Sequence, residues 1–335
     1  MDMFTRDLSL HGAVFNEHEV LPERALRDGF GDGIVEAATR DERIVVLCAD
    51  VTDSVRLTAF KERFPERYIE CGVSEQNMAA VAAGLAQYGK IPYVVAYATF
   101  SPGRNWEQIR TTIALSELPV KVVGMHTGVT VGPDGATHQA LEDITLMRVL
   151  PNMRIVVPLD AEEARKATLA IATNGKPTYL RLSREVSSVM TTEQTPFMES
   201  RAYYLWRSGS PKVAIIGAGP ILSSACEAAK RLQGEGIETS VLNIHTIKPI
   251  DIDAVKGALH ETHAVVTVED HQILGGVGST IAEIAAQNTP VPIEMVAVHD
   301  RFGQSGTPKE LLSAYGLDVD AIVGAVRRVR SRRGD

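Results

Sequence analysis

Residues 74–99, SEQNMAAVAAGLAQYGKIPYVVAYAT, decide the fold of this chain. The first part, 74–88, is rich in Ala and carries its apolar residues at helical spacing, which predicts a helix. The second part, 92–99, is a short apolar run with β-branched residues, which predicts a buried strand. A helix joined to a strand that is apolar on both faces is typical of a parallel sheet covered on both sides by helices. The stretch therefore predicts an α/β fold.

The same alternation of short apolar runs and Ala-rich segments continues on both sides of this stretch. In the first half it predicts further strands over 44–49, 121–126, 154–157 and 178–182, and helices over 28–40, 105–116, 139–150 and 161–173. After an irregular polar segment, strands are predicted over 212–217, 241–244, 264–268 and 293–298. We therefore expect an N-terminal extension (1–24), a domain with a doubly wound parallel sheet (25–186), a linker (187–211) and a second α/β domain (212–330).

The composition and charge exclude several classes of protein. The 34 Lys and Arg residues are outnumbered by 42 Asp and Glu residues, and the net charge of -8 repels phosphates, so we expect no nucleic-acid partner. Cys48, Cys71 and Cys226 are scattered without C-x-x-C spacing, which favours a reducing compartment and a cytoplasmic location. No run of about 18 apolar residues occurs, and the N-terminus lacks a signal-peptide pattern, so we expect no membrane span.

Two glycine-rich turns resemble nucleotide-binding loops but have simpler explanations. GAGP, 217–220, lacks the third glycine of G-x-G-x-x-G, and Pro220 is a favourable first residue of a helix. Gly275, Gly276 and Gly278 would either cradle a phosphate with backbone amides or allow tight packing of a loop against the next helix. For both turns we favour the structural explanation.

Glu75 stands at the predicted start of a helix whose later positions are almost entirely small and apolar. A carboxyl on such a face suits a general acid, or a group that shares a proton with a ligand nitrogen. The alternative is a structural role, because acidic residues in the first turn of a helix complement its dipole. The position alone favours the structural role.

Two loops add residues that would complete a site. YATFSPGRNW, 97–106, presents Phe100 and Trp106, whose rings could stack on a flat heterocycle. MHTGVTVGPDGATHQALED, 125–143, places His126, Asp134 and His138 between a predicted strand and a helix, where open α/β sheets bind ligands. A structural hydrogen bond explains a lone His, whereas two His and an Asp in one loop are also compatible with a polar, titratable pocket.

Long motifs in a fixed order point to a known family. They are GVSEQNMAAVAAGLA (72–86), GPDGATHQALEDITLMRVLPNM (132–153), YLRLSRE (179–185), HTIKPID (245–251) and DRFGQSGTPKELL (300–312). From Arg27 onward the chain resembles the C-terminal half of transketolase, in particular the small subunit of transketolases encoded as two chains. The resemblance implies a thiamine-diphosphate-binding type of fold, with a pyrimidine-binding domain followed by a transketolase C-terminal domain.

The resemblance also implies roles for residues on the cofactor side of the site. Glu75 would hydrogen-bond the pyrimidine N1′ of thiamine diphosphate and so activate the cofactor for transfer of a two-carbon unit. Phe100 would pack on the pyrimidine, and Trp106 stands where the family commonly has Tyr. Gly103 stands where larger transketolases have a further aromatic residue. Asp50 matches an acidic residue near the cofactor and the subunit boundary, with a strand-end cap as its structural alternative.

On the substrate side, the resemblance assigns two groups of residues. His138 and Asp134 match positions that hydrogen-bond the hydroxyls of the donor sugar, and His138 joins Glu75 as a catalytic residue. The positions that bind the substrate phosphate are matched by Arg27, Ser54, His126 and Arg184. Guanidinium, imidazole and hydroxyl groups suit a dianion.

The diphosphate and its divalent metal are expected to bind elsewhere. In this superfamily they bind through G-D-G and a later Asn, on a domain that precedes the pyrimidine domain. Residues 31–33 spell Gly-Asp-Gly, but no Asn follows until Asn77 and the glycines lie within a helical pattern, so we interpret the match as coincidence. We therefore expect no metal ligands in this chain. Mg2+ or another divalent ion would be bound mainly by an N-terminal partner subunit, in an α2β2 assembly.

Two rival functions are weighed against this one. The β subunit of a 2-oxoacid dehydrogenase E1 component has the same length and domain pair, but THQALEDI and the phosphate-binding set favour a transketolase. A non-catalytic transketolase-like protein is disfavoured because Glu75 and His138 are both present. Pentose phosphates and a branched or specialised sugar phosphate both remain open as donors.

Overall fold

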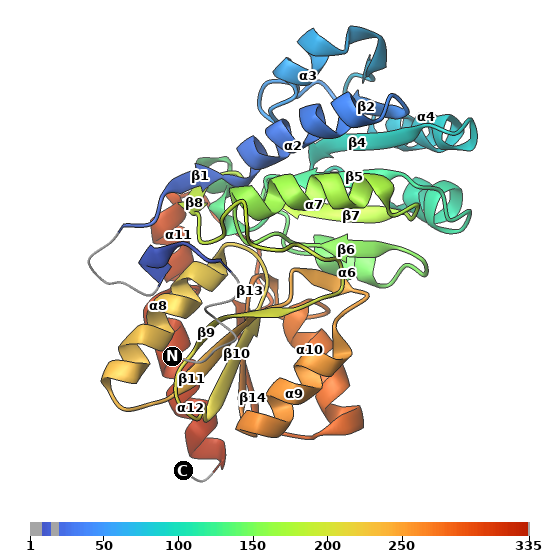
Figure 1. Ribbon diagram of the computed structural model, residues 1–335. Coiled ribbons are helices and arrows are strands. Elements are labelled where there is room, and N and C mark those ends of the chain that lie inside the picture. The colour runs from blue at the N-terminus through green and yellow to red at the C-terminus, as the bar shows by residue number, and fades with distance from the viewer. Residues whose placement is uncertain (1–8, 15–19, 334–335) are drawn as a thin grey trace.

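The buried apolar runs of the sequence form two sheets, which lie in two α/β units, one above the other in Figure 1. The computed structural model describes residues 9–14 and 20–333. Strands β1 (Glu23–Ala25) and β8 (Val186–Ser188) pair with each other and form a separate two-stranded sheet. Within the described ranges, no helix is long and apolar enough to cross a membrane.

The first unit is built on a seven-stranded sheet in the order β12-β6-β7-β5-β4-β2-β3. Its strands are β2 (Ile44–Cys48), β3 (Tyr68–Glu70), β4 (Ile91–Tyr97), β5 (Lys121–Met125), β6 (Arg154–Val156), β7 (Thr178–Leu182) and β12 (Thr246–Lys248). All neighbours are parallel except β12, which is antiparallel to β6. From β2 the chain continues to one edge, and from β4 to the other. The carboxyl ends of β2 and β4 therefore form the switch point at which open α/β sheets bind ligands.

Helices cover both faces of this sheet. Alternate strand residues pack on one side against α2 (Leu26–Arg40), α3 (Thr58–Arg63) and α7 (Ala161–Thr173). On the other side they pack against α4 (Glu75–Gln87), the π-helix η3 (Ile109–Ala114) and α6 (Asp143–Arg148). The short helices η2 (Pro65–Arg67) and α5 (Trp106–Gln108) lie in the connections. The predicted doubly wound sheet is confirmed.

Residues 31–33, Gly-Asp-Gly, lie inside helix α2, which packs closely against helix α7. Helix α2 approaches α7 so closely that a Cβ at Gly33 would lie 2.8 Å from the carbonyl oxygen of Arg165. A Cβ at Gly29, one turn earlier, would lie 1.8 Å from the carbonyl oxygen of Ala161. The glycine spacing in α2 therefore follows from helix packing.

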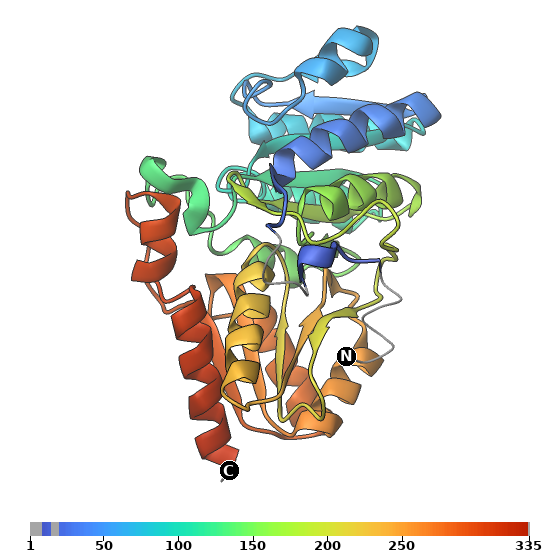
Figure 2. The same cartoon turned by 60° about the vertical axis from the view of Figure 1, so that its left-hand side comes forward.

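The second unit is built on a five-stranded sheet in the order β14-β13-β10-β11-β9. Its strands are β9 (Tyr203–Arg207), β10 (Val213–Gly217), β11 (Thr239–Asn243), β13 (Val265–Gln272) and β14 (Ile293–Val298). Helices α8 (Ile221–Gly234) and α12 (Val319–Arg333) pack on one face, and α9 (Ile252–Thr262) and α10 (Val277–Asn288) on the other. Helix α11 (Pro308–Ala314) reaches back toward the first unit (Figure 2).

The structure differs from the expected elements in several places, and it adds the short elements β1, β8, β12 and α3 that were not predicted. The segment 187–211, expected as an irregular linker, contains β9, which pairs antiparallel with β11 and forms an edge of the second sheet. The helix expected over 139–150 begins only at Asp143, because the residues before it are held in a loop. Strand β3 was not predicted, because its three residues are too few to show a periodic pattern.

The glycine-rich loop at 275–278 cradles a carboxylate of the protein itself. The backbone N–H groups of Val277 and Gly278 donate to the two carboxylate oxygens of Glu269, at 2.7 and 2.8 Å. A Cβ at Gly276 would lie 2.0 Å from Oε2 of Glu269. The buried Glu269 thus occupies the start of helix α10, and the structural explanation of this loop holds.

Candidate active site

The carboxyl ends of five parallel strands meet at one edge of the first sheet, and candidate residues follow each of them. Asp50 and Ser54 follow β2, Glu75 follows β3, Phe100 follows β4, His126, Asp134 and His138 follow β5, and Arg184 follows β7. Arg27 lies at the start of α2. Asp50 and His126 both have φ 57°, an uncommon value for residues other than Gly that clusters at functional sites.

Four rings form a cluster at this edge. The rings of Tyr97 and His126 are stacked, with centroids 4.3 Å apart. Phe100 meets His138 edge to face at 5.5 Å, and Tyr97 meets His138 in the same way at 6.3 Å. Phe100 and His138, assigned to the cofactor and the sugar respectively, are therefore neighbours.

One end of the ring cluster is suited to an anion. Nη1 of Arg27 donates to the carbonyl of Ser54 at 3.0 Å, and Oη of Tyr97 donates to Oγ of Ser54 at 2.9 Å. Burial, and then the nearby cations Arg27 and Arg184, lower the pKa of His126 to about 3, so its imidazole is neutral at neutral pH. Within the described chain, Nε2 of His126 and Nε of Arg27 are buried without a hydrogen-bond partner.

Asp134 and His138 lie in the loop between β5 and α6. Oδ2 of Asp134 accepts from Nη1 of Arg184 at 3.2 Å, which joins two of the predicted substrate residues. The same arginine nitrogen donates to the carbonyl of Val131 at 3.1 Å. Nδ1 of His138 lies 2.9 Å from Oγ1 of Thr137.

Glu75 is the first residue of α4 and is only 3% exposed. In the part of the chain that the structure describes, its Oε2 is buried without a hydrogen-bond partner, and the nearest cation is Nη1 of Arg104 at 3.8 Å. The backbone of Glu75 is held by Asn105, whose Nδ2 donates to the Glu75 carbonyl and to Oγ of Ser101, each at 3.1 Å. Oε2 of Glu75 therefore caps no backbone N–H group of the described chain.

The remaining predicted residues also lie near this edge, but the contacts they make are with the fold itself. The indole N–H of Trp106 donates to the carbonyl of Leu146 at 2.7 Å, and its ring packs on the apolar core. Asp50 is exposed, and its backbone N–H donates to Oε1 of Glu70 at 2.8 Å. At Gly103 a Cβ would lie 1.9 Å from the carbonyl oxygen of Thr99, so this turn has no room for an aromatic side chain.

Sequence reasoning missed two residues of this edge. Tyr97 links His126 to Ser54, and Asn105 connects Glu75 to the loop that carries Phe100. Both stand in the quoted stretch YATFSPGRNW. The position of Tyr97 at the end of a strand was the available signal, whereas the role of Asn105 depends on a contact over 30 positions.

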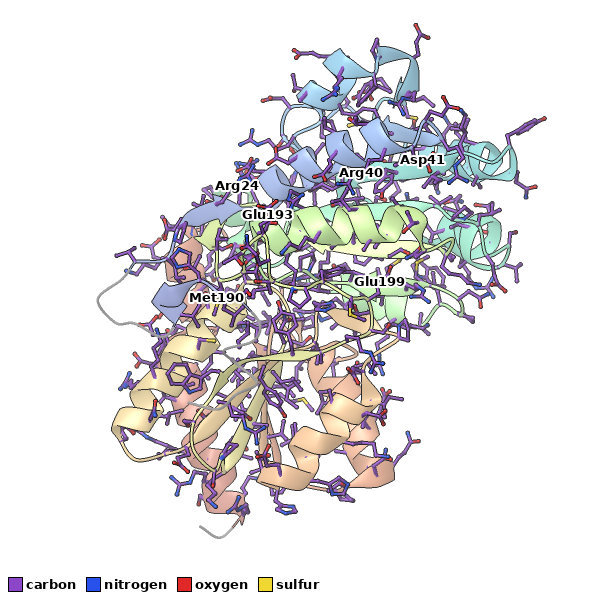
Figure 3. All side chains as sticks on the ribbon, in the orientation of Figure 1. Arg24, Arg40, Asp41, Met190, Glu193 and Glu199 are labelled. Atoms are coloured by element: carbon purple, nitrogen blue, oxygen red, sulfur yellow. The ribbon has the colours of Figure 1, made fainter. Side chains whose placement is uncertain are left out.

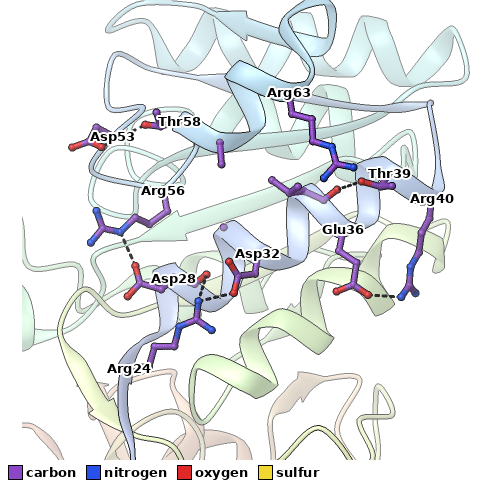
Figure 4. Close-up of a pocket in the computed structure, with 13 residues that line it drawn as sticks. Arg24, Asp28, Asp32, Glu36, Thr39, Arg40, Asp53, Arg56, Thr58 and Arg63 are labelled. Carbon is purple, nitrogen blue, oxygen red and sulfur yellow. Dashed lines mark hydrogen bonds and ion pairs between the residues drawn. The ribbon is translucent and has the colours of Figure 1, made fainter.

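A separate cavity, of about 840 Å3, lies between α2 and α3 and is a weaker candidate. Most of its charged side chains are paired with one another (Figure 4), as Arg56 with Asp28 at 2.6 Å and Arg24 with Asp32 at 2.5 Å. Paired charges at a surface are a weaker signal of a binding site than buried polar atoms without partners. The residues at the carboxyl ends of the strands, called the strand-end site here, differ from this cavity. Several of their buried polar atoms lack hydrogen-bond partners among the described residues.

Two family models match the chain in succession. The model of the transketolase pyrimidine-binding domain matches residues 23–188, and the model of the transketolase C-terminal domain matches residues 203–322. The first match spans the whole strand-end site. The second spans the five-stranded sheet, helices α8 to α11 and the first residues of α12.

Individual relatives match nearly the whole chain, across both domains. The 6-deoxy-6-sulfo-D-fructose transketolase subunit SqwH of Clostridium sp. is 38% identical over 313 residues, covering 93% of this chain and 97% of the relative. One of the subunits of the apulose-4-phosphate transketolase of Phocaeicola vulgatus is 35% identical over 299 residues, covering 89% and 95%. The solved structure of a split-gene transketolase, an inactive beta4 tetramer, has a TM-score of 0.85 and 39% identity, covering 91% and 98%. The chain therefore belongs to the transketolase family, as the C-terminal subunit of an enzyme divided between two chains.

Proposed function

We propose that this chain supplies the pyrimidine side and the donor-sugar side of a thiamine-diphosphate-dependent transketolase site, and that it is active only with an N-terminal partner subunit. The reaction moves a two-carbon ketol unit from a ketose phosphate to an aldose or aldose phosphate. The observation that carries this proposal is the buried Oε2 of Glu75, which lacks a hydrogen-bond partner among the described residues.

The residues of the strand-end site fit the pyrimidine end of the cofactor. When bound, thiamine diphosphate supplies the carbon nucleophile of the reaction. Glu75 holds a proton at the pyrimidine N1′ through Oε2, and Phe100 shields that ring from water. Asn105 fixes the backbone of Glu75, so the carboxylate keeps its place. Asp50 and Trp106 are proposed to lie at the periphery of the cofactor site.

The donor sugar is proposed to lie along the ring cluster. His138 and Asp134 bind its hydroxyls near the bond that breaks, and His138 acts there as a catalytic residue. The terminal phosphate binds among Arg27, Ser54, His126 and Arg184, where the unpartnered nitrogens of Arg27 and His126 support an anion site. Pentose phosphates are one donor class, and the names of the two relatives add specialised sugars as others.

The partner subunit is proposed to bind the diphosphate and Mg2+ or another divalent ion, since the Gly-Asp-Gly of this chain is engaged in helix packing. The names of two relatives as transketolase subunits support a two-chain enzyme, for which we propose an α2β2 assembly. Cys48, Cys71 and Cys226 are free thiols, which supports a cytoplasmic location.

The test compares wild type and Glu75→Gln in the complex with the partner subunit, using ketose phosphates and 2-oxoacids as donors. We expect wild type to prefer ketose phosphates. The Gln variant should assemble with an unchanged melting temperature and lose about 10²- to 10⁴-fold in turnover, because an amide cannot exchange the proton with N1′. Wild-type turnover in an assembled Gln variant would remove Glu75 from the mechanism. A preference for 2-oxoacids would favour a dehydrogenase subunit.

A further inference from the structure

The segment 127–140, called the donor loop here, carries Asp134 and His138 but has little regular structure of its own. It contains one short 3-10 segment, η4 (Val129–Asp134), and its ends meet in an isolated bridge between Thr127 and Ala140. Left-handed backbone at three glycines shapes its path, at Gly128, Gly132 and Gly135. Glycine loses more conformational freedom on ordering than any other residue, so such a loop needs outside contacts to stay in one conformation.

The first outside contact comes from Asp270, on strand β13 of the second unit. Its Oδ1 accepts the backbone N–H of Val129 at 3.0 Å. The carboxylate approaches the loop so closely that a Cβ at Gly128 would lie 1.8 Å from Oδ2 of Asp270. Gly128 is therefore required both by its φ of 77° and by this contact.

The second contact runs through Gln139, which is 3% exposed. Its Nε2 donates to the carbonyl of Val129 within the loop, at 3.1 Å, and to the carbonyl of Gln304 in the second unit, at 2.9 Å. The segment that carries Gln304 also lies against Gly135, where a Cβ would be 2.6 Å from Oγ of Ser305. Helix α11, which follows, packs against η4 (Figure 2).

Arg181 ties these contacts to the base of the loop. It is 5% exposed, and its Nε donates to Oδ2 of Asp143, the first residue of α6, at 2.8 Å. Its Nη2 donates to the carbonyl of Asp270 at 2.8 Å. The buried ion pair therefore joins the end of the loop, strand β7 and strand β13. Removing one partner of such a buried pair would leave an uncompensated charge, so the pair and its contacts are expected to move together.

We propose that Asp270 and Gln139 are positioning residues, through which the second unit holds the donor loop in the conformation that presents Asp134 and His138 to the donor sugar. The catalytic consequence of this inference rests on the proposed function. Both residues act through the backbone of Val129. The second unit thus contributes to the reaction by positioning the donor loop, although the candidate catalytic side chains lie in the first unit.

The test uses the full chain in complex with its partner subunit and four variants. Asp270→Ala removes the acceptor for the Val129 amide, whereas Asp270→Asn keeps an acceptor oxygen and should restore function. Gln139→Glu replaces the donated hydrogen bonds by an acceptor that faces two carbonyls. Asp251→Ala is the matched control, because Asp251 also accepts backbone N–H groups in the second unit, from Ala202 and Ala254, without contacting the loop.

Three readouts are compared among these variants. Amide hydrogen exchange of residues 127–140 should become at least about tenfold faster in Asp270→Ala and Gln139→Glu. The kcat/KM for the ketose phosphate donor should fall roughly 10- to 100-fold in the same two variants, since misplacing the sugar-binding side chains costs orientation. Affinity for thiamine diphosphate should change much less, because Glu75 and Phe100 both lie outside the loop. Asp270→Asn and Asp251→Ala should behave like wild type in all three readouts.

Three outcomes would overturn the proposal. Wild-type loop exchange in both Asp270→Ala and Gln139→Glu would show that these residues do not hold the loop. Faster exchange without a loss for the donor would show that the loop's position does not matter to the reaction. An equal loss in Asp251→Ala would reveal a general effect of destabilisation. A wild-type complex that transfers no ketol unit would refute the proposed function instead, and loop exchange would still decide whether the second unit holds the loop.

Discussion

Glu75 is held through its backbone, and this leaves its side-chain oxygen Oε2 available to a ligand. Asn105 binds the Glu75 carbonyl, while Oε2 is buried and, among the described residues, accepts no hydrogen bond. A buried polar atom without a partner costs about 1–3 kcal/mol of stability. A cost of this size is retained where a bound group supplies the missing donor, and the protonated pyrimidine nitrogen proposed here would do so.

At the anion end of the site, single substitutions should separate phosphate binding from structure. Replacing Arg184 or His126 by Ala removes a contact to a dianion, which costs about 1.5–3 kcal/mol, or roughly 10- to 100-fold in donor affinity. The loss should appear as a higher KM for phosphorylated ketoses. The control is the same ketose without its phosphate. Its KM should hardly change in His126→Ala, and in Arg184→Ala it should rise less than the KM of the phosphorylated ketose, because Arg184 also pairs with Asp134. Equal losses with both donors would mean that Arg184 and His126 have structural roles only.

Among the elements, prediction succeeded where local pattern and burial agree. Helix α7 and strands β7 and β14 have the predicted bounds, because each combines a clear periodicity with turn residues at its ends. Strand β9 was missed because its burial depends on pairing with β11, which is distant in sequence. The residues of the strand-end site were named through long motifs. The hydrogen bonds of Asn105 and Asp270 are tertiary contacts, which periodicity does not report.

The N-terminus of α7 joins the two units through buried carboxylates. Oε1 of Glu163 accepts from Oη of Tyr203 on β9 at 2.7 Å and from Nδ2 of Asn243 on β11 at 3.2 Å. The neighbouring Asp160 accepts the backbone N–H groups of Met190 and Thr191, at 2.8 and 2.7 Å. Met190 begins the segment that passes between the units and continues through Glu193 and Glu199 (Figure 3).

This junction predicts a pH dependence of stability. Burial, and then the charge of Asp160, raise the pKa of Glu163 from near 4.5 to about 7. The folded state therefore binds this proton more tightly than the unfolded state, and the free energy of unfolding falls as pH rises from about 4.5 through about 7. In Glu163→Gln this fall is absent. The wild-type advantage over the variant should shrink by roughly 3 kcal/mol across that range, measured by urea unfolding. A constant difference would contradict the assigned shift.

At the scale of the whole molecule, the two units form one body that carries part of a site. A single cluster of buried apolar side chains includes Val45 and Ile155 from the first sheet and Ala214 and Leu242 from the second. The strand-end site has acceptors and rings for a heterocycle and cations for an anion, all at the edge of the first sheet. We expect the partner subunit to close this edge and to add the ligands of the diphosphate.

The claim that this chain carries half of an active site is tested most directly by calorimetric titration of thiamine diphosphate with Mg2+. The titration is run into the chain alone, into the N-terminal subunit alone and into their mixture. We predict binding with Kd of about 1 μM or tighter in the mixture only, accompanied by ketol transfer. Binding of that strength, or ketol transfer, by the isolated 335-residue chain would contradict the account.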